Sequence, residues 1–112
     1  MAFDATLEVT GGIAKITLSG ELDASAAPAF RAQIERAGEQ RPTRLVLFMR
    51  DLDYIASAGL RVLIFAKQKM GAAVDLYAIA PQAQVMDTFE MTGFDHSLRI
   101  LDEYDADHIE NV

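Results

Sequence analysis

The sequence predicts an α/β fold, with a mixed but mainly parallel sheet opened by an antiparallel hairpin and three to four helices. Two observations lead to this class. Apolar and polar residues alternate over residues 3–18 and are interrupted by two glycines, which is typical of two strands joined by a tight turn. Beyond residue 25, segments with helical spacing alternate with short apolar segments, and each strand–helix–strand unit requires a parallel, right-handed crossover.

The first two strands are predicted at residues 3–9 and 14–18, where every second side chain is apolar. This period of two places the apolar side chains on one face of a strand. Gly11 and Gly12 separate the two segments, and both can adopt the positive φ angles of a two-residue hairpin turn. The chain is therefore expected to begin with an antiparallel hairpin.

The first helix is predicted from Ser25, because apolar residues then recur with helical spacing. They are Ala26, Phe30, Ile34 and Ala37. Pro28 fits the first turn, where its missing amide hydrogen would have no partner within the helix. Gly38 is expected to end this helix, and Pro42 to prevent it from resuming.

A buried strand and a second helix follow. Residues 43–49 are nearly all apolar, which is typical of a strand covered on both faces. Residues 50–56 are expected to form a polar loop, and residues 57–70 a helix that ends at Gly71. On this helix the spacing predicts an inward face of Leu60, Leu63 and Ile64 and an outward face of Arg61, Lys67 and Lys69.

The rest of the sheet is predicted from three short segments. Residues 73–79 form a strand in this interpretation, and Pro81 opens a third helix with Val85, Met86 and Phe89 on one face. Gly93 closes that helix, and residues 98–101 form a last short strand.

The composition indicates one globular domain over residues 1–112. Its 51% hydrophobic content supports a buried core, and the length leaves no room for a second domain. The sequence contains no cysteine, no leader-like N-terminus and no long apolar segment, so we expect a cytoplasmic protein without disulfides. A net charge of −7 argues against binding to nucleic acids and to membranes.

Part of the acidic excess lies in the last segment, residues 102–112. The acidic residues there are Asp102, Glu103, Asp105, Asp107 and Glu110. We expect this segment to be a solubilising, partly frayed tail rather than a docking segment.

Ligands of open α/β sheets collect at the carboxyl ends of parallel strands, which here are expected to lead into loops at residues 19–25 and 50–57. Ser57 falls where a helix begins. Its hydroxyl is expected to accept a hydrogen bond from the amide of Gly59 or Leu60 and so to cap the helix. A phosphate on the same oxygen would meet the positive end of the helix, so the position is suited to phosphorylation.

Two other functions, a serine hydrolase and a receiver-like phosphoryl acceptor, fit the sequence less well. Ser57 before Gly59 resembles half of a nucleophile elbow, but Ile55 stands where the sharp turn needs glycine, and the possible bases His96 and His108 lie near the chain end. A receiver-like phosphoryl acceptor would need an acidic pair after the first strand to hold a metal beside Asp51 or Asp53, and the hairpin offers none. No cofactor and no metal are therefore expected, and we expect no enzymatic activity.

Three motifs resemble the marks of STAS domains. They are Gly20-Glu21-Leu22-Asp23, then Tyr54-Ile55-Ala56-Ser57-Ala58-Gly59-Leu60-Arg61-Val62-Leu63, and Met91-Thr92-Gly93-Phe94-Asp95. The resemblance spans about residues 5–102, with the motifs in the right order on the predicted topology.

The resemblance is strongest to anti-sigma factor antagonists. It implies that the unphosphorylated chain captures an anti-sigma factor that is also a serine kinase, and that phosphorylation of Ser57 ends the capture until a serine phosphatase reverses it. The implied partner-binding residues are Asp23, Ala56, Ser57, Ala58, Gly59 and Arg61.

Two residues depart from the pattern of that family. Ala56 stands where an acidic residue often precedes the serine, and Phe48 where the central strand often has an aspartate. The alternative that the resemblance leaves open is a STAS binding or scaffold subunit, without a phosphorylation switch, in a lipid-transport or stress-signalling complex.

Overall fold

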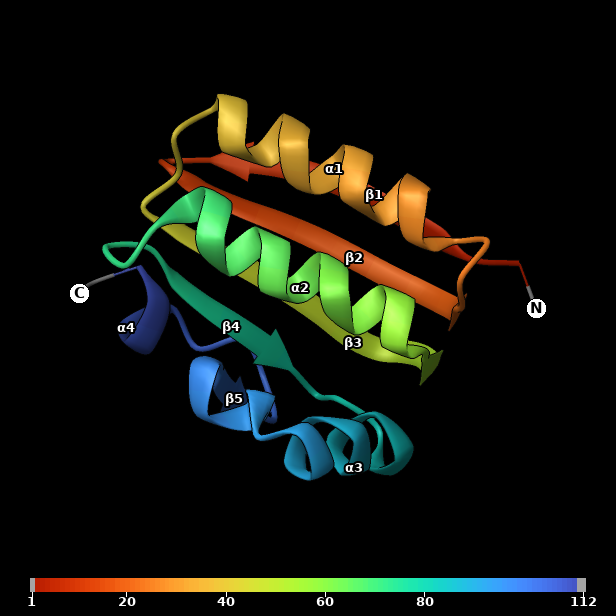
Figure 1. Cartoon of the computed structure of the whole chain (residues 1–112). Helices are drawn as coiled ribbons and strands as arrows, with labels where there is room; N and C mark the ends of the chain where they lie inside the picture. Colours follow the sequence, from red (N-terminus) through yellow and green to blue (C-terminus); the bar gives the residue numbers. More distant parts are fainter. Residues whose placement is uncertain (1, 111–112) are drawn as a thin grey trace.

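The computed structural model describes residues 2–110 as one five-stranded sheet with helices on both faces (Figure 1). The elements follow in the order β1 (Asp4–Thr10), β2 (Ile13–Leu22), α1 (Ala27–Glu39), β3 (Arg44–Ile55), α2 (Ser57–Met70), β4 (Asp75–Ile79), α3 (Ala83–Thr92), the 3-10 helix η1 (Phe94–Ser97), β5 (Arg99–Leu101) and α4 (Ala106–Ile109). The strands lie in sequence order, β1 antiparallel to β2 and every later pair parallel. The predicted fold class is confirmed.

The hairpin that opens the sheet is built as predicted. Thr10 pairs with Ile13, and the two residues between them, Gly11 and Gly12, have φ angles of 59° and 80°. Positive φ at both central positions is the geometry whose twist matches that of the flanking strands, and it is strained for other residues. The two glycines therefore set the register of β1 on β2.

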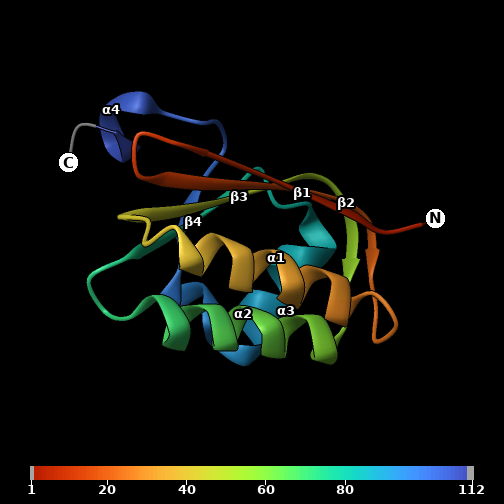
Figure 2. The ribbon, with the colours of Figure 1, turned by 90° about the horizontal axis from the view of Figure 1, so that it is seen from above.

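The ends of β2 and β3 correct the prediction of loops at residues 19–25 and 50–57. The two strands remain paired as far as Leu22 and Ile55, through irregularities at Thr17/Ser19 and Gly20/Glu21. Leu22, Leu52 and Ile55 are buried, so this distal part of the ribbon has its own apolar face. The bulges increase the local twist, and both strand ends turn toward the helices (Figure 2). Asp51 and Asp53 consequently lie on a strand rather than in a loop.

α1, α2 and α3 cover one face of the sheet, and the main core lies between them (Figure 2). Its largest fully buried side chains include Phe30, Phe89, Ile16, Leu18, Leu45, Leu47 and Leu63. On α2, Leu60 and Leu63 point inward as predicted and Arg61 and Lys69 are exposed, but Ile64 is 41% exposed, so its predicted inward position is wrong. Val62 and Ala66 are buried instead, because the inward face of the helix is rotated by one position.

α1 also differs from its predicted bounds. It continues past Gly38 to Glu39, so this glycine does not end the helix. A Cβ at Gly38 would lie 2.8 Å from Cε of Lys69. The flexible outer end of the Lys69 side chain on α2 crosses α1 at this glycine, and it can shift if a side chain is present there.

The C-terminal segment packs against the other face of the sheet, so the prediction of a partly frayed tail is wrong for it. Ile109 is 1% exposed and belongs to a second apolar cluster with Ile13, Val46, Tyr77 and Ile79. The ring centres of Tyr104 and Phe48 lie 5.8 Å apart. Nζ of Lys15 lies 4.7 Å from the centre of the Tyr104 ring. Burial and the bond that its hydroxyl donates to Glu110 raise the pKa of Tyr104 to about 12. Residues 111–112 of the predicted tail lie outside the described residues.

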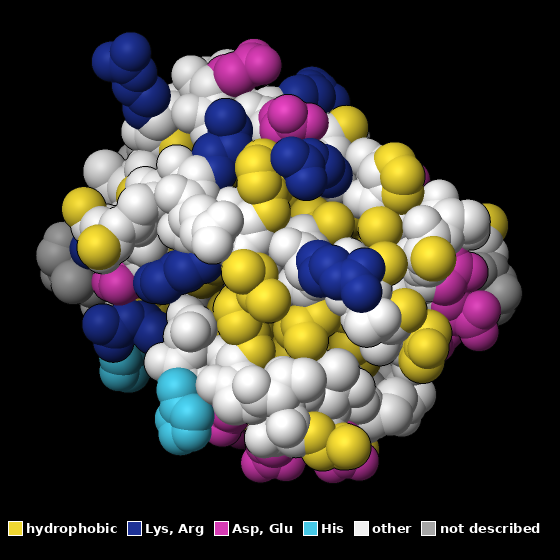
Figure 3. All heavy atoms as spheres, viewed as in Figure 1, with side chains coloured by type: hydrophobic (Ala, Val, Ile, Leu, Met, Phe, Trp, Pro, Cys, Tyr) yellow, Lys and Arg dark blue, Asp and Glu magenta, His cyan; other side chains and the backbone are white. Residues whose placement is uncertain are grey.

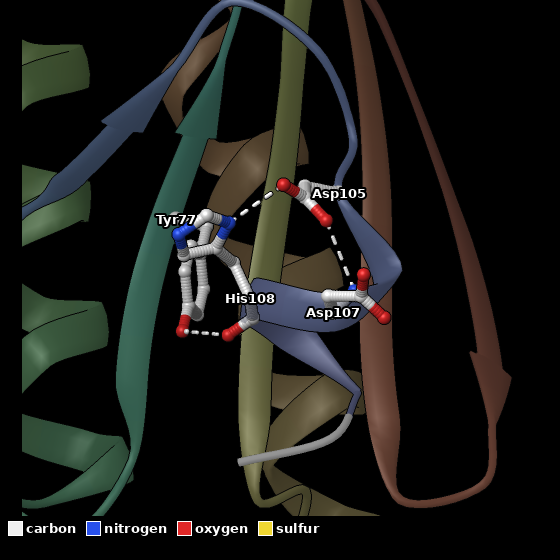
Figure 4. A network of polar contacts seen from close by, with 4 residues as sticks. All are labelled: Tyr77, Asp105, Asp107 and His108. Atoms are coloured by element: carbon white, nitrogen blue, oxygen red, sulfur yellow. Dashed lines mark hydrogen bonds and ion pairs between the residues drawn. The ribbon is translucent and has the colours of Figure 1, made fainter.

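Polar contacts hold α4 in place (Figure 4). Asp105 accepts a hydrogen bond from the amide of Asp107 at 3.0 Å and contacts Nδ1 of His108 at 2.6 Å, and the bond to His108 lowers the pKa of Asp105. The hydroxyl of Tyr77 on β4 donates to the carbonyl of His108 at 3.2 Å. Asp105 thus caps a docked helical turn, so the acidic segment does more than solubilise the chain.

Candidate functional site

Ser57 is the first residue of α2, and its side chain is exposed. Ala56 occupies the N-cap position with an extended backbone, φ −87° and ψ 169°, and the first α-helical bond runs from the amide of Leu60 to the carbonyl of Ala56. No side chain caps the helix, so the prediction that the Ser57 hydroxyl accepts from Gly59 or Leu60 is wrong. Ser57 occupies the first helical position rather than the N-cap, the position from which a side chain accepts from those amides, and within residues 2–110 its hydroxyl forms no hydrogen bond.

The residue before Ser57 is tied to the end of β2. The amide of Ala56 donates to the carbonyl of Leu22 at 2.8 Å, so the two strand ends run together into α1 and α2. Asp23 and Ser57 follow this junction on neighbouring segments, as the sequence motifs imply.

Asp23 also organises the entry to α1. One carboxylate oxygen accepts from the Ser25 hydroxyl at 2.8 Å and from the amide of Ala26 at 2.9 Å. Its backbone carbonyl accepts from the amides of Ala26 and Ala27, each at 3.1 Å. The bond from Ser25, and then that from Ala26, hold the pKa of the Asp23 carboxyl below its ordinary value. This structural role was not apparent from the sequence.

Gly59 is buried beneath the surface that Ala58 and Ser57 present. A Cβ on Gly59 would lie 2.6 Å from Cγ of Leu22 and 3.1 Å from Cγ1 of Ile55. Glycine is therefore required for α2 to begin directly against the ends of β2 and β3. Gly59 acts at this site by allowing that close approach, not by offering a side chain.

Two glutamines that the sequence analysis did not single out hold the strand end before Ser57. Gln82 donates to the carbonyl of Arg50 at 2.8 Å and to the Asp53 carboxylate at 3.2 Å, and Gln84 donates to the carbonyl of Asp53 at 2.5 Å. Both glutamines lie at the start of α3, about 30 residues along the chain from the groups that they contact. Neither a glutamine nor its neighbours in the sequence indicate such a distant contact.

The outer side of α2 combines positive charge with exposed apolar surface. α2 contains Arg61, Lys67 and Lys69 and no acidic residue, although the whole chain has a net charge of −7. Ile64 is exposed on this side, and the guanidinium of Arg31 on α1 lies 3.8 Å from the centre of the Phe65 ring. In Figure 3, Lys and Arg side chains lie on both sides of and above an apolar area on this face. Met91, which belongs to the last turn of α3 and to the third motif, is 86% exposed.

The structure does not bring a histidine to Ser57. His108 lies on α4, across the sheet from α2 (Figure 2). His96 lines a cavity of about 400 Å³ with Lys67, which is ten residues and thus about 15 Å along α2 from Ser57. The serine–histidine pair of a hydrolase is therefore not assembled from either histidine.

Residues 2–110 contain no group of three or more metal-binding side chains placed to hold an ion. Within the same range, no helix has the length and apolar character needed to cross a membrane.

A comparison with known protein families shows to which family this chain belongs. The family model for the STAS domain matches residues 4–106. The chain belongs to the STAS domain family. The junction of β2, β3 and α2 described above carries the first two motifs of that family, and α3 with η1 carries the third.

Two curated STAS relatives carry the name of anti-sigma factor antagonists. BtrV of Bordetella bronchiseptica is 32% identical over 90 residues, which cover 80% of this chain and 78% of BtrV. The anti-sigma-F factor antagonist RsfB of Mycobacterium tuberculosis is 26% identical over 89 residues, covering 80% of this chain and 73% of RsfB.

The same fold is seen in SpoIIAA of Bacillus, described as an anti-sigma factor antagonist. Its unphosphorylated form superposes with a TM-score of 0.81 and 24% identity, covering 99% of this chain and 98% of SpoIIAA. Its phosphorylated form superposes with a TM-score of 0.66, covering 88% of this chain and 90% of SpoIIAA. These likenesses show the fold.

Proposed function

We propose that this STAS protein is an anti-sigma factor antagonist, which binds a kinase-type anti-sigma factor and is switched off by phosphorylation of Ser57. The observation that carries the proposal is an exposed serine at the first residue of α2, whose hydroxyl forms no hydrogen bond to the described part of the chain. The names of RsfB and BtrV support the antagonist role. A serine phosphatase would restore binding, and a protein with these partners would act in the cytoplasm.

The proposed binding surface is centred on the start of α2. It consists of Asp23, Ala56, Ser57, Ala58 and Arg61, with Gly59 beneath it. The basic side of α2 extends this surface, and charge complementarity then favours a partner with acidic groups opposite Arg61 and Lys69.

A phosphoryl group at Ser57 suits the free protein and opposes the complex. Near a helix N-terminus an anion is favoured by about 0.3–1 kcal/mol, so the modified domain is expected to remain folded. In the complex, the phosphate would repel negative charges of the partner. Two like unit charges about 6 Å apart, at an effective dielectric of about 20, repel each other with an energy of about 3 kcal/mol. A difference of about 3 kcal/mol corresponds to roughly a hundredfold loss of affinity.

A binding module without a switch is the alternative, and Ala56 is the observation that favours it. Ala56 provides no carboxylate to help a kinase place the serine hydroxyl. Phe48, the other departure from the family pattern, has a local explanation, because its ring packs on Tyr104 on the face opposite α2.

Calorimetric titration of the cognate anti-sigma factor against wild type, Ser57→Ala and Ser57→Asp tests the proposal. Ser57→Ala is expected to bind as wild type does, since it removes no capping bond and adds no charge. Ser57→Asp is expected to bind less tightly, with an unchanged thermal melt. Incubation with the partner and ATP should add one phosphate to wild type and none to Ser57→Ala. Equal binding of all three chains, with Ser57 left unmodified, would leave the module without a switch as the function.

A further inference from the structure

A phosphoryl group on Ser57 would add a charge of about −1.5 to −2 to the first turn of α2. α2 carries no acidic residue, and its cationic residues are Arg61, Lys67 and Lys69. The position of these cations along the helix decides which of them can meet the phosphate.

Arg61 lies four residues after Ser57, the spacing at which two side chains are neighbours on a helix. The anion would stand nearer the N-terminus and the cation nearer the C-terminus, which is the favourable orientation of such a pair. Lys67 and Lys69 are ten and twelve residues away, or about 15 and 18 Å along the axis, so their charges are screened from Ser57 by salt.

Nothing in the described part of the chain competes for Arg61. Its side chain is exposed, and within residues 2–110 it forms neither a hydrogen bond nor an ion pair. The other residues at helical-neighbour spacing, Ala58, Ile64 and Phe65, are apolar. By contrast, Arg31 lies over the Phe65 ring and Arg99 pairs with Asp75 at 3.4 Å.

Building on the proposed switch, we propose that Arg61 is the intramolecular counter-ion of a phosphoryl group on Ser57. In the unphosphorylated protein the guanidinium faces the partner. After phosphorylation it turns to the phosphate oxygens, with which it can form two parallel hydrogen bonds. Phosphorylation then acts twice on the binding surface: it adds negative charge and withdraws the nearest positive charge.

The test uses the full chain with phosphoserine incorporated at position 57 during synthesis, so it requires no kinase. Phosphorus NMR follows the second ionisation of the phosphate as pH is varied. A cation about 5 Å away in water, screened over about 8 Å, lowers the pKa of that ionisation by about 0.3 unit. Arg61→Gln should therefore raise this pKa by about 0.3 unit, Arg61→Lys should keep it low, and the matched control Lys69→Gln should leave it unchanged.

Two results would overturn the proposal. One is the same phosphate pKa in wild type and Arg61→Gln. The other is an equal rise in Arg61→Gln and Lys69→Gln, which would attribute the shift to net charge rather than to a pair. Because the phosphate is introduced by synthesis, absence of a kinase reaction at Ser57 would count against the proposed switch and not against this pairing.

Discussion

The backbone amide of Ala56 donates to the carbonyl of Leu22 at 2.8 Å, which fastens the residue before Ser57 to the end of β2. Ala56 is itself the N-cap residue of α2, so one hydrogen bond joins the second strand, the third strand and the helix. The side chain of Leu22 continues this contact beneath Gly59. The position of Ser57 on the surface thus depends on packing between residues that are far apart in the sequence.

Gly59→Ala is expected to destabilise the protein by about 1–3 kcal/mol, since the added Cβ would lie 2.6 Å from Cγ of the buried Leu22. The matched control is Gly38→Ala, whose Cβ would meet the far end of the flexible Lys69 side chain. Alanine also stabilises a helix interior by about 0.5–1 kcal/mol relative to glycine, so this control should be neutral or stabilising. Urea unfolding measures both, and a Gly59→Ala protein as stable as wild type would contradict the packing described at the start of α2.

Leu63→Ala is expected to reduce the free energy of unfolding by about 2–5 kcal/mol, because Leu63 is 0% exposed in the main core. Ile64→Ala, one residue along the same helix, removes a side chain that is largely in solvent and should change stability by no more than about 1 kcal/mol. Thermal or urea unfolding of the pair checks the rotation of α2. A loss for Ile64→Ala as large as that for Leu63→Ala would restore the inward position predicted for Ile64 from the sequence.

Ile109→Ala is expected to destabilise the protein by about 2–4 kcal/mol, although it lies only three residues from the chain end. Tyr104→Phe is the control, since it removes an exposed hydroxyl bond to Glu110 and keeps the ring on Phe48. Hydrogen exchange of the β4 amides should increase in Ile109→Ala and not in Tyr104→Phe. If removal of residues 102–112 left both stability and exchange unchanged, the segment would be a free tail after all.

The pKa of Asp23 is expected below 3.8, chiefly because its carboxylate accepts the Ser25 hydroxyl bond. A carboxyl whose folded-state pKa is depressed stabilises the protein above its unfolded-state pKa, and this contribution is lost as pH falls through the lower, folded-state value. Ser25→Ala should therefore raise the Asp23 pKa and weaken the fold at neutral pH more than at pH 2. Carbon NMR of the carboxyl follows the titration. An Asp23 pKa unaffected by Ser25→Ala would show that the bond contributes nothing in solution.

Charge reversal at Arg61 or Lys69 is expected to slow association with the anti-sigma factor about tenfold at low salt while the melting temperature stays the same. The physical reason is that α2 supplies the positive side of an otherwise acidic protein. Reversal of the exposed Arg99, beside Asp75 at the β5 edge, is the control. Stopped-flow mixing at several salt concentrations measures the rates, and three variants with wild-type rates would exclude this side of α2 from the interface.

Local patterns in the sequence determine much of this fold. The period of two and Gly11–Gly12 specify the hairpin, and helical spacing with Gly93, which has φ 75°, specifies α3 and its end. These features follow from backbone geometry within a few residues, which is why they could be predicted. The position of Ser57 at a helix start was predicted in the same way, while its capping bond was not formed, because one residue decides between the N-cap and the first helical position.

The tertiary structure alone decided which segments meet. The apolar residues 43–49 predicted a strand buried on both faces. The face turned away from α2 is covered by the acidic C-terminal segment, through Ile109, although the composition of that segment indicated a solvated tail. In that segment Tyr104 and Ile109 pack on the sheet while the carboxylates remain at the surface. Likewise, Gln82 and Gln84 hold the strand before Ser57 through contacts about 30 residues apart. Such choices depend on the fit between distant surfaces, and no short stretch of sequence contains that information.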